Sequence, residues 1–373
     1  WTKIKKVGGF KMRKVIASLL VILMVFGLLG CESNNSAPDT KEPVQEAPNI
    51  ETDDEKAGEI KDPVDLMFIS MASTTAIYTY STTIANMLLD VLPPGSTIDV
   101  PETSPGGLTA QYSVINGDTD LVVMNGISVK WSMENENGVM DMGKVTGGVS
   151  SLVNGFDMPH ITILFTNAFI DKTDCVSMEE LVKNKVPANF YIKQKGNLGE
   201  GAFTQTLEAL NTTEEDLISW GCTVTRDTAA NIGTAFQDGL ADITIDHLPN
   251  GQAATVQLTT NTECKVVGMA EETANALADK GWTKGIWKAG SSKFIGHDED
   301  VLTVGAPNCL IARPDPDDDI AYLITKTVCE NRDKLVAASA ALEEFQPEKG
   351  GEILTEILHP GALRYYKEKG YIK

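Results

Sequence analysis

The sequence lacks most of the patterns on which enzyme active sites are built. It has four histidines, scattered along 373 residues, and it contains no G-x-S-x-G nucleophile elbow, no Walker loop and no H-E-x-x-H helix. The glycines between Gly196 and Gly201 are in the wrong order for a dinucleotide-binding fingerprint, and Cys175 has no obvious base near it in the sequence. We therefore expect a protein that is not an enzyme, with no catalytic residue and no cofactor.

Cysteine motifs are missing as well. None of the six cysteines belongs to a C-x-x-C pair or to a Cys/His cluster at zinc-ligand spacing, so we expect no metal site. Apart from Cys31, an odd number remains: Cys175, Cys222, Cys264, Cys309 and Cys329. A disulfide between Cys222 and Cys264 stays open, but small buried core thiols are the favoured interpretation.

Positive charge is scarce. Six of the 31 Lys and Arg residues fall within residues 1–30, so the rest of the chain carries 25 basic against 52 acidic side chains, a net charge of −27. This charge excludes nucleic acids and anionic membrane surfaces as partners. An anionic ligand would therefore have to be held by local hydrogen-bond donors.

One long hydrophobic run is present, and no second run of membrane-spanning length follows it. Arg13 and Lys14 precede the apolar stretch Val15–Leu29, which is shorter than the roughly 20 apolar residues of a spanning helix. The run ends in Leu28-Leu29-Gly30-Cys31, which resembles the lipobox of bacterial lipoproteins. The resemblance implies that residues 1–30 are a signal peptide and that acyl chains on Cys31 anchor the protein to the membrane outside the cytoplasm. A plain secretory signal or a single anchor helix is the alternative.

Residues 31–62 have a different composition. They are rich in Asp, Glu, Asn, Ser and Pro and contain almost no large apolar side chains. Such a segment cannot bury enough surface to offset its chain entropy. We predict a disordered tether that holds a globular domain away from the bilayer.

From Val64 onward, strands and helices are expected to alternate. Val64–Ser70 is an apolar run suited to a buried strand, and apolar residues at helical spacing follow it from Ile77 to Val91, where Pro93 and Pro94 end the helix. Further strands are predicted over Ser96–Glu102, Leu121–Met124, Ile161–Phe165 and Ala241–Asp246. This repetition predicts an α/β fold with parallel or mixed sheets.

Several helix starts carry recognisable caps. Ser177–Glu180 is a capping box before a helix that begins at Leu181, and Thr212–Glu215 is a second box. Asp315–Asp319 are expected to start another helix, with Pro316 in its first turn.

Four stretches of the globular part form a recognisable combination. In Gly296–Pro307, acidic residues precede a Thr-Val-Gly turn and a proline, and Leu358–Tyr366 contains His-Pro-Gly-Ala followed by aromatics. Asn116–Leu121 and Gln237–Asp242 each contain a Gly-x-x-Asp turn from helix to strand. In order and spacing, these stretches resemble the TAXI solute receptors of TRAP transporters, over a range from about Val64 to the C-terminus.

The resemblance implies the two-lobed periplasmic-binding-protein fold, similar to type II, with two hinge crossings and C-terminal helices. Residues 64–158 and 304–373 would form the first lobe and residues 159–303 the second, with crossings near Ile161–Phe165 and Val304–Ala312. Ligand would be held between the lobes, which close by hinge bending.

In open α/β sheets, ligands bind beyond the carboxyl ends of strands and near helix N-termini. The loops at these places offer hydroxyls, amides, free backbone N–H groups and one aromatic ring, and they contain the expected ligand-binding residues: Ser73, Thr74, Thr75, Tyr78, Gly106, Gly107, Asn125, Asn197, Leu198, Asp246 and His247. Each of three groups has an alternative role. Ser73–Thr75 could simply cap a helix, Gly106 and Gly107 could be required by a turn, and His247 could be a capped loop residue. Arg226 and Arg313 are expected at the surface, so no arginine clamp for a carboxylate is assigned.

The ligand-facing loops depart from the family's usual sequences. Thr75–Thr79 replaces a Gly-rich stretch after the first strand, and Gly196–Gly199 replaces a Gly-Ser-Gly-Thr-like loop. Leu108 and Gln111 stand where Gly-Gly-Ser and a following Asn are usual. The scaffold is therefore retained while the loops differ.

The resemblance also implies a function. The chain would be a monomeric extracytoplasmic receptor that captures a small organic solute, a carboxylate or an amino acid such as glutamate. It would deliver this solute to an ion-gradient-driven TRAP permease, a separate membrane protein. The alternatives are a ligand-sensing lipoprotein of the same fold without a transport role and, less favoured, an enzyme.

Overall fold

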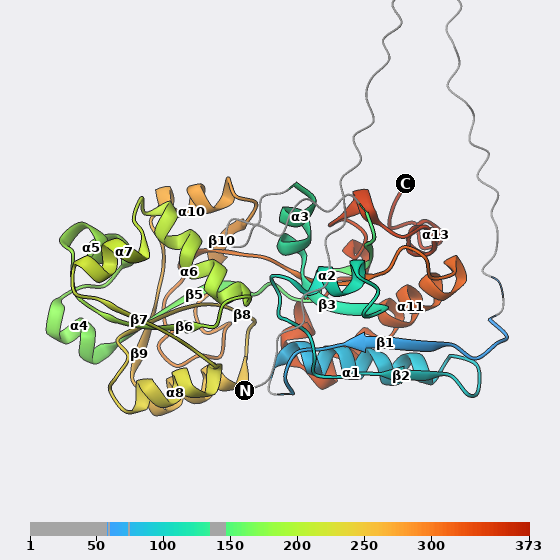
Figure 1. Ribbon diagram of the computed structural model, residues 1–373, viewed down its shortest axis with the longest axis horizontal. Coiled ribbons are helices and arrows are strands. Elements are labelled where there is room, and N and C mark those ends of the chain that lie inside the picture. The colour runs from blue at the N-terminus through green and yellow to red at the C-terminus, as the bar shows by residue number, and fades with distance from the viewer. Residues whose placement is uncertain (1–57, 59, 74, 135–146) are drawn as a thin grey trace, which may run out of the picture. The chain divides into compact units, whose positions relative to one another are not determined.

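The computed structural model describes residues 58, 60–73, 75–134 and 147–373. In that part of the chain, twelve strands form two sheets with helices packed around them (Figure 1). The predicted signal peptide, Cys31, most of the predicted tether and Thr74 lie outside the described residues.

The first sheet has the strand order β2-β1-β3-β12-β4. Its strands are β1 (Asp65–Ile69), β2 (Thr97–Asp99), β3 (Leu121–Asn125), β4 (Ser150–Asn154) and β12 (Asn308–Ala312). β1 pairs in parallel with β2 and β3, whereas β12 runs antiparallel to β3 and β4. The predicted strand Ser96–Glu102 shortens to three residues in β2. All of β3 is buried, because helices cover both faces of the sheet.

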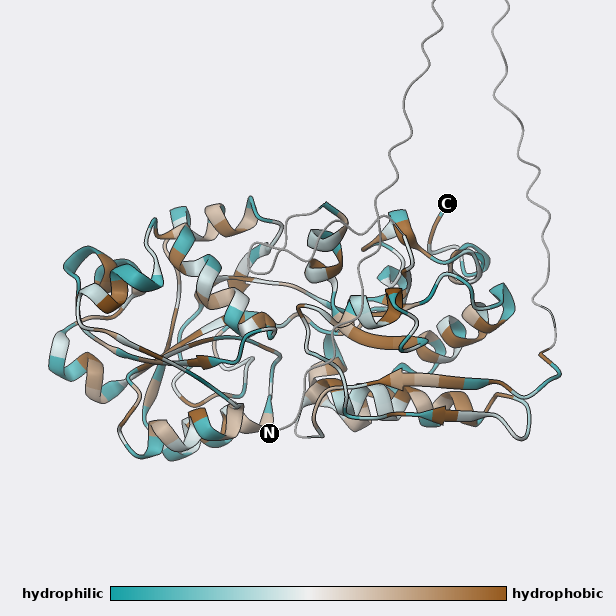
Figure 2. Cartoon of the chain, viewed as in Figure 1, coloured by the Kyte–Doolittle hydropathy of each residue, from teal (hydrophilic) through white to brown (hydrophobic). Residues whose placement is uncertain are grey.

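The second sheet has the order β10-β11-β5-β8-β6-β7, and β9 pairs with β5 outside this path. Its strands are β5 (His160–Thr166), β6 (Asn189–Lys193), β7 (Thr223–Asp227), β8 (Ile243–Leu248), β9 (Cys264–Val267), β10 (Thr283–Trp287) and β11 (Val301–Gly305). β6 is parallel to β7 and β8, while β5 is antiparallel to β8. Figure 2 shows hydrophobic residues along the strands of both sheets.

The described chain passes from one sheet to the other at two crossings, residues 155–159 between β4 and β5, and residues 306–307 between β11 and β12. Ile161–Phe165 thus lies wholly within β5, and the crossing comes just before it. The crossings run side by side, because Gly305 pairs with His160 and Ala306 N–H donates to the Pro159 carbonyl at 3.0 Å. A Cβ at Gly305 would lie 2.6 Å from the Pro159 oxygen, so this close approach requires glycine.

Helices complete the two lobes. Around the first sheet lie α1 (Ala76–Leu89), α2 (Ala110–Ile115), α3 (Gly126–Glu134), α11 (Asp318–Glu330), α12 (Arg332–Ala338), α13 (Pro360–Glu368) and the short 3₁₀ turns η1 (Ala340–Glu344), η2 (Pro347–Lys349) and η3 (Thr355–Ile357). Around the second lie α4 (Asn167–Thr173), α5 (Met178–Asn184), α6 (Leu198–Ala209), α7 (Glu214–Ser219), α8 (Ala229–Gln237), α9 (Ala253–Asn261) and α10 (Glu271–Ala278). The C-terminal helices therefore belong to the first sheet, as the predicted fold requires.

Each sheet has its own hydrophobic core. Phe68, Tyr80 and Tyr366 are among the residues that fill the first, and Phe165, Phe190 and Phe203 are among those that fill the second. α3 connects the two, because Trp131 packs edge-on against Trp282 with ring centroids 5.6 Å apart.

Three predicted helix starts are displaced by one to three residues. α5 begins at Met178 and not at Leu181, because Ser177 itself is the N-cap and accepts from Glu180 N–H. The second capping box is formed by Thr213 and Asp216 and not by Thr212 and Glu215. Pro316 lies outside α11, because Asp317 is its N-cap. In the second and third cases a neighbouring Thr or Asp residue forms the cap in place of the predicted one.

The cysteines within the described ranges, Cys175, Cys222, Cys264, Cys309 and Cys329, are free and buried, which confirms the core-thiol interpretation. Across the same ranges, none of the helices combines the length and apolar character that crossing a bilayer requires. A grouping of three or more His, Cys, Asp or Glu side chains suited to a metal ion is also missing from the described residues.

Candidate functional site

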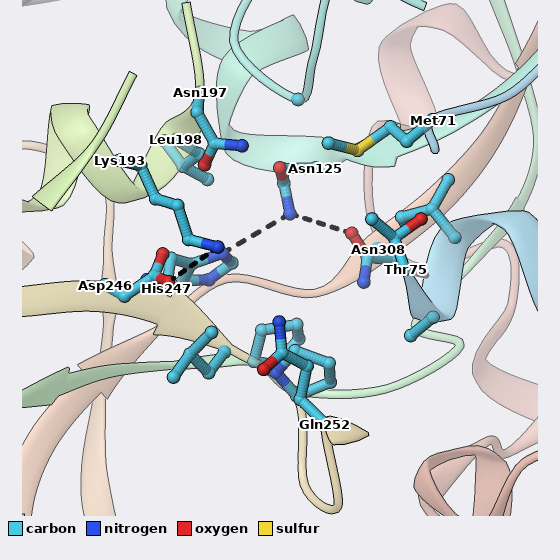
Figure 3. A pocket seen from close by; sticks show the side chains of 16 residues that line it. Met71, Thr75, Asn125, Lys193, Asn197, Leu198, Asp246, His247, Gln252 and Asn308 are labelled. Atoms are coloured by element: carbon cyan, nitrogen blue, oxygen red, sulfur yellow. Dashed lines mark hydrogen bonds and ion pairs between the residues drawn. The ribbon is translucent and has the colours of Figure 1, made fainter. Parts of the chain in front are cut away.

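A pocket of about 80 Å³ lies where loops from both sheets meet (Figure 3). It is lined by residues from four strands, two helices, the first crossing and the adjoining loops: Met71, Thr75, Ala76, Ile77, Gly107, Asn125, Pro159, Lys193, Asn197, Leu198, Asp246, His247, Leu248, Pro249, Gln252 and Asn308. In Figure 3, Lys193 and Asp246 lie on one side, Thr75 and Asn308 lie on the other, and Asn125 projects between them.

Most of the predicted binding residues come together here. Seven of them line the pocket: Thr75, Gly107, Asn125, Asn197, Leu198, Asp246 and His247. Ser73 and Tyr78 do not line it; Ser73 is exposed, and its backbone N–H donates to Glu102 Oε2. Gly106 also lies outside the lining. A Cβ there would sit 2.9 Å from the Gly196 carbonyl oxygen, so this glycine, with φ of +109°, permits close contact between the lobes.

Three helix N-termini are directed to the pocket. Thr75 caps α1 by accepting from Tyr78 N–H at 3.3 Å, Asn197 caps α6 by accepting from Gly199 N–H at 2.9 Å, and Gln252 caps α9 by accepting from Thr255 N–H at 3.0 Å. Thr75, Asn197 and Gln252 thus each cap a helix and also line the pocket. The positive ends of these helix dipoles favour a partly negative group on a ligand.

A buried hydrogen-bond chain connects the pocket with the first crossing. Asn125 Nδ2 donates to Asn308 Oδ1 at 2.7 Å, and Asn308 Nδ2 donates to Asp157 Oδ1 at 2.7 Å. Asp157 Oδ2 in turn accepts from the Tyr80 hydroxyl at 2.8 Å. Asn125 Nδ2 also lies 3.5 Å from His247 Nδ1, on the second sheet. Because Asn308 takes one amide hydrogen of Asn125, the orientation of the Asn125 side chain is fixed before any ligand binds.

His247 is an uncharged pocket residue. Burial lowers its pKa to about 3, and the nearby His160 contributes to this. The ring packs edge-on against Trp282, with centroids 5.3 Å apart. His247 can therefore offer a neutral donor or acceptor to a ligand, but no positive charge at neutral pH.

Charge in the pocket comes as a pair. Lys193 Nζ lies 3.3 Å from Asp246 Oδ2, and both side chains are largely buried. Burial raises the pKa of Asp246, and the Lys193 ammonium opposes that increase. The predicted surface arginines are paired elsewhere, Arg226 with Glu200 and Glu214, and Arg313 with Asp120 and Asp315.

Sequence reasoning missed nine lining residues: Met71, Ala76, Ile77, Pro159, Lys193, Leu248, Pro249, Gln252 and Asn308. Lys193 could have been found, because it ends β6, a strand parallel to its neighbours, just before the predicted loop at Asn197. Gln252 caps a helix after β8 and follows the same rule. For Pro159 and Asn308, the sequence contains no comparable signal, because Pro159 lies in the first crossing and Asn308 is the first residue after the second.

Comparison with known proteins agrees with this architecture. Residues 177–370, more than half of the chain, match the model of the NMT1-like family. No curated protein matches the sequence. The structure of MatC from Rhodopseudomonas palustris with bound malate is similar with a TM-score of 0.50 and 13% identity, over 82% of this chain and 99% of that one.

Two further structures are similar at lower TM-scores. The periplasmic binding protein BugD has a TM-score of 0.47 and 17% identity, over 83% of this chain and 93% of that one. An R. palustris protein with adipate has a TM-score of 0.48 and 12% identity, over 83% and 95% of the two chains. The two sheets joined by two crossings are the two-lobed fold of periplasmic binding proteins, and the chain belongs to the NMT1-like family.

Proposed function

We propose that this protein is an extracytoplasmic receptor that captures a small organic solute in the pocket between its lobes and delivers it to a TRAP-type permease. The observation that carries the proposal is the pocket itself, because it collects side chains from both sheets next to two adjacent crossings. A solute held there touches both lobes and thereby stabilises their closed arrangement. MatC, which has the same fold, was solved with malate, a small organic acid.

The lobes and the anchor belong to the same proposal. Residues 64–158 and 304–373 would form one lobe and residues 159–303 the other, so that closure brings Asn125 toward Asp246 and His247. Acyl chains on Cys31, together with the tether that follows, would keep the receptor close to its permease. The TAXI subfamily is the proposed assignment within this class of receptors.

Mass spectrometry of solutes released from the gently purified chain tests the proposal. We expect one small organic molecule at close to one equivalent, recovered unchanged, and calorimetry should show that it rebinds. A pocket that arrives empty, and that small carboxylates and amino acids fail to fill, would contradict the receptor function.

Asn125→Ala tests the site. This change removes the amide that is held between Asn308 and His247, so we expect affinity for the recovered solute to fall at least about tenfold, equivalent to about 1.4 kcal/mol. Asn86→Ala is the matched control, because Asn86 is exposed toward the end of α1 distant from Ala76 and Ile77. Equal affinities of the two variants would remove Asn125 from the site.

A further inference from the structure

The charged pair in the pocket is built into the second sheet. Lys193 ends β6 and Asp246 lies in β8, which are adjacent parallel strands. Only 13% of the Lys193 side chain and 8% of the Asp246 side chain are exposed. A Cβ at Gly199, in the first turn of α6, would collide with Asp246 Oδ1, so a glycine is needed for the helix to approach the pair this closely.

The pair leaves hydrogen-bonding capacity free. Lys193 has three ammonium hydrogens, and within the described residues its ammonium pairs with Asp246 Oδ2 at 3.3 Å. Asp246 Oδ1 accepts from its neighbour's backbone, His247 N–H, at 2.8 Å. Both charged groups line the pocket, so a ligand can reach them.

No other lining residue among the described ones carries charge at neutral pH. The rest of the lining is amide, hydroxyl, neutral imidazole or apolar, and the pKa of His247 is lowered to about 3 by burial. The net charge of the pocket walls is therefore zero, one ammonium against one carboxylate.

We propose that the pocket selects solutes without net charge, and specifically a zwitterion whose ammonium binds Asp246 and whose carboxylate binds Lys193. This inference rests on the proposed receptor function and narrows its ligand class from carboxylates or amino acids to amino acids with an uncharged side chain. Asp246 and Lys193 are its charge-selecting residues.

The reason is the cost of an uncompensated buried charge. When one carboxylate of a dicarboxylate binds Lys193, Asp246 loses its ionic partner. The second carboxylate of the ligand is also left without a cation, because the described lining residues contain no other one. A zwitterion inserts between the two groups and leaves every charge paired. The helix N-termini capped by Thr75 and Asn197 assist the carboxylate end, since they favour partial negative charge.

The remaining walls suit a short body. Met71, Ile77 and Leu248 provide apolar contacts, while Asn125 and Gln252 provide amide hydrogen bonds. A small side chain that is apolar or carries an amide matches this combination.

A matched set of probes on the purified full chain tests the inference. Uncharged L-amino acids from alanine to glutamine are screened by thermal shift, and the best is compared by calorimetry with its deaminated acid, its decarboxylated amine, succinate, malate and adipate. We expect the amino acid to bind at least 30-fold more tightly than each of these. A dicarboxylate or the deaminated acid that binds as tightly would overturn the inference and leave the receptor function standing. If no probe binds and no solute copurifies, both fail.

Asp246→Asn adds a change that a purely structural role would not produce. With Lys193 released, the deaminated acid should bind at least tenfold more tightly than to the original protein, and the amino acid at least tenfold more weakly. Parallel loss of both would overturn the charge-selecting role. Glu208→Gln is the control, because it removes the carboxylate of the Lys280–Glu208 pair, outside the pocket, and should change neither affinity.

A double variant guards against misfolding. If Asp246→Asn does not fold, Lys193→Met combined with Asp246→Asn removes both charges while keeping the side-chain volumes. This protein should bind the amino acid and its deaminated acid within about threefold of each other. Retained 30-fold discrimination would contradict the assignment.

Discussion

Replacing Asp157 with Asn should change how the stability of this protein depends on pH. Asp157 lies in the first crossing, and its side chain is buried between the Tyr80 hydroxyl and the Asn308 amide, at 2.8 and 2.7 Å. An asparagine fits the same space, because its oxygen can accept from Asn308 and its amide can donate to the Tyr80 hydroxyl. The variant therefore keeps the packing but has no ionisable carboxyl group at this position.

The magnitude follows from the pKa of Asp157, which burial raises from 3.8 to about 7, with a further contribution from the nearby charge of Glu344. Between these two values the folded chain holds a proton that the unfolded chain has released. The associated stability is fully present below pH 3.8 and is lost as the pH rises through about 7. Three units at 1.36 kcal/mol each correspond to about 4 kcal/mol.

Urea denaturation of both proteins at fixed ionic strength, followed by tryptophan fluorescence between pH 4 and 8, measures this effect. The wild-type curve alone is not sufficient, because His160 and His247 act in the opposite direction. Burial lowers their pKa values to about 4 and about 3, so their contribution is present at higher pH and is lost as the pH falls through those values. These terms cancel in the difference between wild type and variant.

The stability difference, wild type minus Asp157→Asn, should therefore fall by about 4 kcal/mol from pH 4 to pH 8. Asp238→Asn, at an exposed side chain, is the matched control and should give a flat difference. A difference for Asp157→Asn that stays constant across the range would show that the folded chain does not hold this proton. The reasoning from burial would then be refuted.

Two further substitutions test the pocket and the contact between the lobes. In Gly107→Ala the new Cβ would overlap Asn125 Oδ1, so we expect solute affinity in calorimetry to fall at least tenfold. Gly233→Ala in α8, where a Cβ meets nothing, should leave affinity unchanged and raise stability by up to about 1 kcal/mol; equal affinities would refute the steric argument. Asn250→Ala removes a hydrogen bond from Trp287 in β10 and one to Glu344 in η1, which hold the loop after β8 against these two elements. We expect about 1 kcal/mol less stability and up to about fivefold weaker solute binding, whereas unchanged melting and binding would show that the contact is dispensable.

Much of the fold could be predicted from local sequence. The apolar runs Val64–Ser70 and Leu121–Met124 correspond to β1 and β3, because a short apolar run between turn residues is typical of a buried strand. The alternation of strands with helices then implies sheets covered by helices, and that is what the chain forms. The predicted helix starts differ from the observed ones by one to three residues, because adjacent Ser, Thr and Asp residues can each cap a helix.

Part of the site could also be anticipated. Thr75, Asn125 and Asn197 follow strands at their carboxyl ends or cap the next helix, and that local rule applies whichever strands become neighbours. Seven of the residues that this rule predicted line one pocket. The same rule could not exclude Ser73 or Tyr78 from the site, because a shift of one or two residues around a helix start directs a side chain away from the pocket.

Tertiary structure alone decided the rest. Lys193 and Asp246 are 53 positions apart, and only the pairing of β6 with β8 sets them 3.3 Å from each other and makes the pocket walls neutral. Asn308 and Pro159 reach the pocket because two crossings far apart in the chain run side by side. By itself, the sequence determined which segments become strands, helices and polar turns, since those follow from nearest neighbours. The charge balance of the pocket depends on strand register and on distant contacts, which no local pattern specifies.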